Sequence, residues 1–196
     1  MDLALQDARS WEPNVSLCVG DLRALPVAGP FDVIYNIDVL EHVEDPPRLL
    51  AAFATCLRPD GILYLHVPAA EQRHFLPGVD REYSWLGPPS PGDVHLFEGI
   101  DAAQLVGWLE AAGFAVLSTR RTFGAVVSIL KELFMLAEAR RVPAVGLALV
   151  PLLALATRLE WWWGGRRGNG VCVVAHRRAP VARTVPPRMR TAGVSG

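Results

Sequence analysis

The chain has 196 residues, 51% of them hydrophobic and 20% charged, which is enough to build one domain around a single core. Its formal net charge of −1 excludes an overall electrostatic attraction to nucleic acid, because proteins that bind nucleic acid usually present a basic patch or stripe. The three cysteines are odd in number and widely spaced, so they predict reduced core cysteines in a cytoplasmic protein, with no disulfide framework and no metal site.

The first predicted strand is the alternating run of residues 14–19, which a turn at Gly20 and Asp21 would end. Residues 31–35 predict a second, buried strand that ends at Asn36, because its valine and isoleucine favour extended backbone.

The residues after this second strand are candidates for ligand binding. Asp38 is expected to cap a helical turn over residues 39–43. Asn36, Ile37 and Asp38 would then lie at the carboxyl end of a parallel strand, where open α/β sheets bind their ligands.

A helix is expected from Pro46 to about Leu57, followed by a buried strand over residues 62–67. His66 has no partner in view and is interpreted as a satisfied core or edge histidine. Residues 69–99 form a long insert, too rich in proline and glycine for regular structure, that we expect to contact the substrate.

Asp101 is expected to cap a helix that ends at Gly113. Two strands, residues 114–118 and 171–176, would form an antiparallel pair that closes the sheet edge. Residues 179–196 are basic and proline-rich and predict a disordered tail.

Residues 125–141 predict an amphipathic helix, and residues 142–157 are uncharged and almost wholly apolar. The apolar run is shorter than the ~20 residues of a spanning helix and is interrupted by prolines. Two interpretations remain open. The insert over residues 125–163 is either a buried helical hairpin beside the sheet, which we favour, or a peripheral membrane contact, with arginines and Trp161 at the interface.

Several motifs in one order resemble class I S-adenosylmethionine-dependent methyltransferases over roughly residues 12–178. The motifs are Gly20-Asp21-Leu22, Leu25-Pro26, Phe31-Asp32-Val33-Ile34, Asp38, Leu40-Glu41-His42-Val43, Asp45-Pro46, Leu57-Arg58-Pro59-Asp60-Gly61 and Val67-Pro68.

The resemblance implies an α/β, Rossmann-like methyltransferase sheet with strand order 3-2-1-4-5-7-6, in which residues 14–19 form strand 3. Nothing before Asn14 matches the first two strands or the glycine-rich cofactor loop. We therefore expect an N-terminally truncated methyltransferase domain over residues 1–178, with the helical insert before its last strand. An apolar strand edge or face would be left open, which predicts marginal stability, a compensating partner or self-association.

The resemblance also assigns roles to the cofactor site. Asp21 would accept a hydrogen bond from the adenine amino group of S-adenosylmethionine, because an ionised carboxylate only accepts hydrogen bonds. Leu22, Asn36, Ile37 and Asp38 would line the rest of the cofactor site.

On the acceptor side, the resemblance places His42 near the transferred methyl as a general base or orienting donor. A histidine that only holds its loop is the alternative. Tyr83, His95 and Phe97 would face the acceptor, or else form an aromatic cluster that holds a lid in place.

The function implied is transfer of a methyl group from S-adenosylmethionine to a small-molecule, lipid-linked or sugar acceptor, in the cytoplasm or at the membrane surface. The alternative is a non-catalytic, methyltransferase-like interaction subunit or a membrane-associated subunit. A nicotinamide-dependent oxidoreductase would need a GxGxxG loop after its first strand, and the sequence has none.

Overall fold

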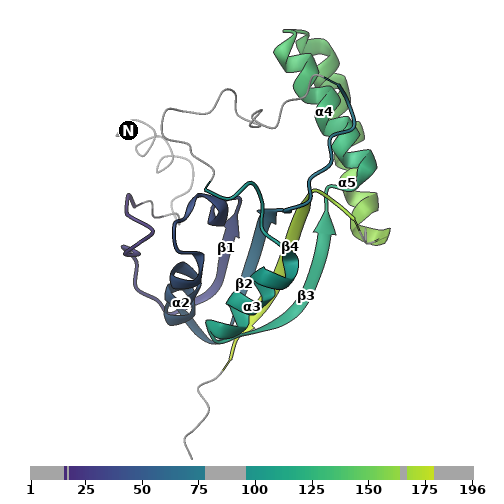
Figure 1. Ribbon diagram of the computed structural model, residues 1–196. Helices are drawn as coiled ribbons and strands as arrows, with labels where there is room; N and C mark the ends of the chain where they lie inside the picture. Colours follow the sequence, from purple (N-terminus) through teal and green to yellow (C-terminus); the bar gives the residue numbers. More distant parts are fainter. Residues whose placement is uncertain (1–15, 17, 78–95, 164–166, 179–196) are drawn as a thin grey trace, which may run out of the picture.

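The computed structural model describes residues 16, 18–77, 96–163 and 167–178. Four strands form one sheet in the order β1-β2-β4-β3 (Figure 1). These strands are β1 (Phe31–Ile37), β2 (Leu57–Pro68), β3 (Phe114–Thr122) and β4 (Gly170–Arg177). β1 and β2 are parallel, whereas β4 runs antiparallel to both β2 and β3. This order confirms the expected 4-5-7-6 half of the methyltransferase sheet.

Two helices, α2 (Pro46–Cys56) and α3 (Ala102–Ala111), pack on one face of the sheet (Figure 1). The amide of Arg48 donates to Asp45 at the start of α2, and Asp101 caps α3 as expected. Alternation along β2 then places Leu63 and Leu65 against these helices, fully buried in the main core.

The opposite face of the sheet is open along β1. Val33, Tyr35 and Ile37 share that face and are 41%, 71% and 53% exposed. No helix in the described ranges covers them, and no described strand pairs with the outer edge of β1. Within the described residues, the apolar strand β1 is therefore exposed both on its face and on its edge.

The strand expected over residues 14–19 does not form in the residues that can be described. Ser16, Cys18 and Val19 have no regular structure, and only an isolated bridge joins Asp21 to Ala24. For Ser16, Cys18 and Val19 the prediction is wrong, because no strand in the described part of the chain lies beside them to pair with. Cys18 is also exposed, so only the other two cysteines are the buried, reduced thiols that the sequence predicts.

The turn after β1 also differs from expectation. Asp38 does not cap the short 3-10 helix η1 (Leu40–His42), which has no side-chain cap. Instead Asp38 adopts a φ of 49° and directs its carboxylate to His66 on β2. The carboxylate pairs with an imidazole, so it is unavailable to the helix amides.

The helical insert over residues 125–163 forms two antiparallel helices, α4 (Ala125–Ala139) and α5 (Pro143–Trp163). They project beyond the top edge of the sheet (Figure 1). α5 continues through Pro151, and Pro143 is its first residue, where a missing amide costs no hydrogen bond. The run Pro143–Trp162 is long and apolar enough to cross a membrane by length and composition, and only 6% of it is buried. The favoured interpretation, a buried hairpin beside the sheet, is therefore wrong.

Candidate functional site

The carboxyl ends of β1 and β2 are joined by a histidine that the sequence left without a partner. His66 Nδ1 lies 2.8 Å from Asp38 Oδ1, and its Nε2 lies 2.8 Å from Thr122 Oγ1 at the end of β3. The amide of Asp38 also donates to the carbonyl of His66 at 3.0 Å. This confirms His66 as a satisfied histidine. The imidazole braces the strand ends and fixes the backbone turn at Asp38.

This brace depends on a close approach of the backbone of Gly170. A Cβ at this glycine would lie 2.3 Å from Thr122 Oγ1 and 2.6 Å from His66 Nε2. Only glycine therefore lets the histidine and threonine side chains meet across β4.

Two buried polar side chains beside this turn have unused acceptors. Asn36 is 6% exposed and Glu41 is 1% exposed, and neither Asn36 Oδ1 nor Glu41 Oε2 has a hydrogen-bond partner among the described residues. Burial raises the pKa of the Glu41 carboxyl, and the charge of Asp38 raises it further. The site end of β1 therefore has acceptors available for donor groups of a ligand.

Asp21 lies in an exposed turn and is already engaged by Arg23. The Arg23 side chain donates to both carboxylate oxygens at 2.7–3.1 Å, and its backbone amide donates to Oδ1 at 2.9 Å. These hydrogen bonds from Arg23 lower the pKa of Asp21 to about 2. The Asp21 carboxylate is therefore ionised and could accept a hydrogen bond from an adenine amino group, but it already accepts hydrogen bonds from Arg23. Leu22 beside it is 39% exposed.

The described residues fit the cofactor only as one wall of a site. Two cavities lie in the described part of the chain, and neither is lined by Asp21, Asn36, Ile37 or Asp38. One cavity lies at the amino end of β1, and the other lies beside the amino-terminal end of α4. The unused acceptor of Asn36 suits a ligand, but neither of these two cavities joins Asp21 to Ile37.

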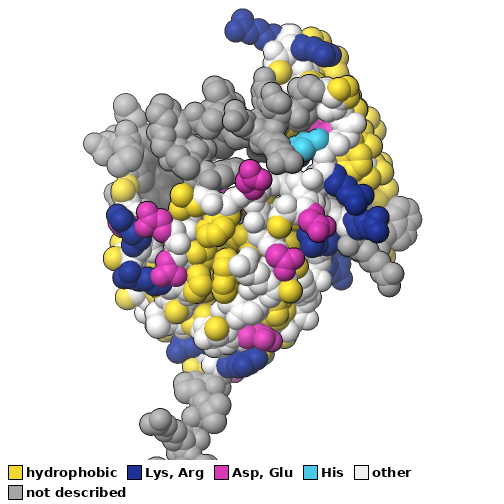
Figure 2. Space-filling view, viewed as in Figure 1, with side chains coloured by type: hydrophobic (Ala, Val, Ile, Leu, Met, Phe, Trp, Pro, Cys, Tyr) yellow, Lys and Arg dark blue, Asp and Glu magenta, His cyan; other side chains and the backbone are white. Residues whose placement is uncertain are grey.

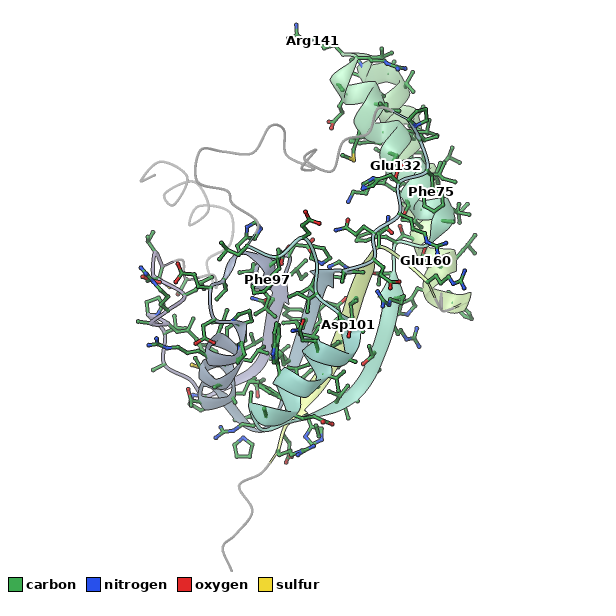
Figure 3. All side chains as sticks on the ribbon, viewed as in Figure 1. Phe75, Phe97, Asp101, Glu132, Arg141 and Glu160 are labelled. Atoms are coloured by element: carbon green, nitrogen blue, oxygen red, sulfur yellow. The ribbon has the colours of Figure 1, made fainter. Side chains whose placement is uncertain are left out.

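The acceptor-side residues are only partly placed. Tyr83 and His95 lie outside the described residues. The Phe97 ring packs against the core and meets Trp108 edge-on at 6.4 Å, as in the aromatic cluster that was the alternative (Figure 3). His42 lies in η1 and is half-buried. Its catalytic role remains a prediction.

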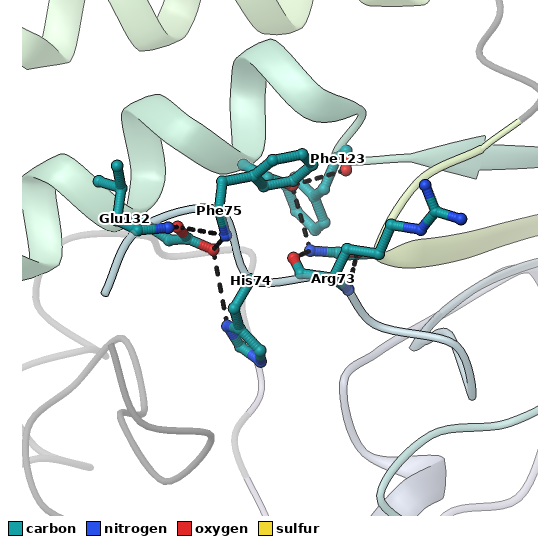
Figure 4. A network of polar contacts seen from close by, with 8 residues as sticks. Arg73, His74, Phe75, Phe123 and Glu132 are labelled. Carbon is teal, nitrogen blue, oxygen red and sulfur yellow. Dashed lines mark hydrogen bonds and ion pairs between the residues drawn. The ribbon is translucent and has the colours of Figure 1, made fainter. Parts of the chain in front are cut away.

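Glu132 is the functional candidate that the sequence reasoning missed, because its charge placed it on the polar side of α4. It is 4% exposed, and its carboxylate accepts the amides of Phe75 and Leu76 at 2.8–3.1 Å (Figure 4). His74 Nδ1 lies 3.5 Å from Glu132 Oε1. An acid within a run of apolar helix residues was the available signal. The Glu132 carboxylate therefore anchors the start of the 69–99 insert to α4.

Asn169 supports the same segment from the turn before β4. Its side-chain oxygen accepts the Arg73 amide at 2.8 Å, and its Nδ2 donates to the Arg73 carbonyl and to Ser128 Oγ. A cavity lies here, lined by Glu71, Arg73, Arg121, Phe123, Arg167 and Asn169, among others. Three cations and one acid give it a positive character.

Parallel strands whose carboxyl ends carry polar residues, with an antiparallel pair closing the sheet, define the Rossmann-like methyltransferase class. The methyltransferase domain family matches residues 5–119, more than half of the chain. This chain therefore belongs to that family, the class I S-adenosylmethionine-dependent methyltransferases.

Curated relatives match over shorter lengths. A ubiquinone biosynthesis O-methyltransferase of Xanthomonas axonopodis pv. citri is 38% identical over 99 residues, which cover 48% of this chain and 39% of the relative. A malonyl-[acyl-carrier protein] O-methyltransferase of Xylella fastidiosa is 44% identical over 64 residues, covering 30% of this chain and 21% of the relative. The matched segments thus span well under half of these relatives.

A solved structure supports the fold over a longer range. The S-adenosylmethionine-dependent methyltransferase of Mesorhizobium loti superposes with a TM-score of 0.53 at 19% identity, covering 90% of this chain and 77% of that chain. At this identity the likeness establishes the fold alone.

Proposed function

We propose that this chain acts in the transfer of a methyl group from S-adenosylmethionine to an oxygen of a small-molecule, lipid-linked or sugar acceptor, in the cytoplasm at a membrane surface. The observation that carries the proposal is the end of β1, where the unused acceptor of Asn36 lies beside the braced turn at Asp38. The relatives named as O-methyltransferases support an oxygen acceptor.

In this proposal Asp21 and Leu22 hold the adenine, while Asn36, Ile37 and Asp38 line the remainder of the cofactor. The Asp38–His66 pair keeps that turn in one conformation before the ligand arrives, which reduces the ordering cost of binding. The cofactor supplies an electrophilic methyl group, and what this chain contributes is position and shape.

His42 is the proposed orienting donor or base on the acceptor side, with Tyr83 and His95 facing the acceptor, whereas Phe97 packs against the core. A base is optional for this class of reaction, because positioning alone supplies a large share of the rate acceleration. Replacement of His42 by alanine should therefore lower the turnover number without abolishing cofactor binding.

A second, non-catalytic function is supported by the incomplete cofactor site, of which the described residues form only one side. If the described residues form all of it, the chain is a non-catalytic, methyltransferase-like subunit that binds a partner or a second copy through the open edge of β1. The exposed apolar residues of that strand support this alternative.

Titration calorimetry with S-adenosylhomocysteine distinguishes the two functions. The comparison uses this chain, a version extended upstream, and the variants Asp38→Asn and Asp32→Asn. Asp32 is the matched control, since it is an exposed acid at the other end of β1 that pairs with Arg58. The methyltransferase proposal expects binding that Asp38→Asn weakens at least about tenfold and Asp32→Asn leaves unchanged. Absence of binding by both chain lengths, or equal effects of both substitutions, would refute it.

A further inference from the structure

α5 presents an almost wholly apolar side to solvent. The residues of α5 that approach α4 recur every three or four positions, from buried Gly146 to half-buried Glu160. The residues on the other side are exposed, Leu147 by 75%, Leu155 by 54% and Leu159 by 41%. Figure 2 shows apolar side chains along the outer side of this hairpin. A surface of this extent on a helix pair marks a contact with another phase or molecule.

Charges are arranged at the two ends of this surface and nowhere along it. Between Val142 and Thr157 the sequence has no charged residue. Arg140 and Arg141 are exposed in the turn between α4 and α5, at the hairpin tip, where Figure 3 labels Arg141. Arg158 is exposed near the other end of α5. The Trp162 side chain is 80% exposed beside it. The exposed surface of α5 is therefore apolar in its middle, with arginines at both ends and a tryptophan at one end. This distribution suits a bilayer interface, where apolar side chains enter the acyl region and cations meet anionic headgroups.

The base of the hairpin is tied rigidly to the sheet. The Glu160 carboxylate accepts the Gly124 amide at 2.8 Å, which ties the end of α5 to the start of α4. Arg120 of β3 donates to the Trp161 carbonyl at 3.1 Å, and its guanidinium lies 4.9 Å from the centre of the Trp161 ring. The hairpin and the sheet therefore face any docking surface in a fixed relative orientation.

We propose that the α4–α5 hairpin docks this chain onto an anionic lipid bilayer, with the exposed side of α5 lying in the interface. An in-plane position follows from the connectivity. If α5 crossed the bilayer, the antiparallel α4 would cross with it and carry Lys131 and Glu132 to mid-depth. Glu132 holds the amides of Phe75 and Leu76 instead, so α4 stays against the rest of the domain.

Docking in this orientation gives the proposed function a source of acceptor. The hairpin rises beyond the carboxyl ends of β1 and β2, the edge that carries the candidate site (Figure 1). An acceptor that partitions into the bilayer would then reach this edge without crossing bulk water. This last step rests on the proposed methyl transfer, whereas the lipid contact itself does not.

Flotation of the full chain with vesicles tests the docking. Vesicles of phosphatidylcholine with one part in four phosphatidylglycerol should bind the chain, more tightly than phosphatidylcholine alone, and several-fold less tightly when salt rises from about 0.05 M to about 0.5 M. Leu147→Ser with Leu155→Ser should weaken the binding at least about tenfold. Leu117→Ser is the matched control, because Leu117 is a 59% exposed leucine on β3, and it should bind as the unaltered chain does.

A second pair of variants keeps the test decisive if the serine variant is poorly folded. Arg140→Gln with Arg141→Gln changes only exposed tip residues, and it should remove most of the preference for phosphatidylglycerol. The proposal is overturned if the unaltered chain does not float with the anionic vesicles at low salt, or if both variant pairs float as it does. It is also overturned if the chain is a dimer that Leu147→Ser and Leu155→Ser convert to a monomer without any effect of vesicles. These outcomes are independent of S-adenosylhomocysteine binding, so the two proposals fail separately.

Discussion

Removal of the Glu132 carboxylate should release the start of the 69–99 insert from α4. Two backbone amides, Phe75 and Leu76, donate to this buried carboxylate. A hydrogen bond to a charged group contributes about 1.5–3 kcal/mol, and the released amides recover part of this from water. We therefore expect Glu132→Ala to lower the local opening free energy by about 2–4 kcal/mol, and Glu132→Gln by about half as much, because glutamine retains one acceptor oxygen.

Native-state amide hydrogen exchange measures this loss directly. Since 1.4 kcal/mol corresponds to a factor of ten, exchange at Phe75 and Leu76 should accelerate by about 30- to 700-fold in Glu132→Ala. Glu138→Ala is the control, because Glu138 is an exposed acid on the same helix. Unchanged exchange at these two amides in Glu132→Ala, or equal acceleration in Glu138→Ala, would show that the carboxylate does not hold the segment.

Two further predictions concern the core of the candidate site. Burial raises the pKa of the Glu41 carboxyl above 4.5 in the folded protein. The folded protein therefore binds this proton more tightly than the unfolded chain does, and the free energy of unfolding should fall as pH rises through the pKa of Glu41 in the folded protein. Glu41→Gln should flatten this dependence in urea melts at about pH 5 and about pH 8; an unchanged slope would contradict the assignment. Gly170→Ala should destabilise the fold by about 1–3 kcal/mol, because its Cβ would overlap His66 and Thr122. Gly107→Ala, a helical position with nothing within 4 Å, should instead stabilise it by about 0.5–1 kcal/mol in the same melts; equal effects of the two alanines would refute the packing argument.

Much of the sheet was predictable because it is encoded locally. The strands around Val33, Leu63 and Val173 are apolar runs bounded by turn residues, and the family strand order then fixed their neighbours. The cap at Asp101 was predicted by the same local logic. Strand ends were less predictable, since β2 and β3 extend beyond the predicted runs by pairing with neighbours.

The site depended on contacts that no local pattern records. His66 meets Asp38 and Thr122 across separations of 28 and 56 residues, so its role appears only when the strands are assembled. Glu132 was assigned to solvent by residue type, although its amide partners lie 56 and 57 residues away. The exposure of α5 was hidden for another reason: a helix that is apolar on every side has no periodicity to distinguish core from surface.

The outer edge of β1, with which no described strand pairs, affects how this protein behaves at high concentration in a cell. A row of backbone donors and acceptors left open in this way, beside exposed aromatic and branched side chains, is a template on which strands of separate molecules can pair. Newly made copies would compete between acquiring their proper cover and joining one another, and the second process accelerates with the number of copies present. Abundance, and not only sequence, would then decide how many of these molecules remain dispersed.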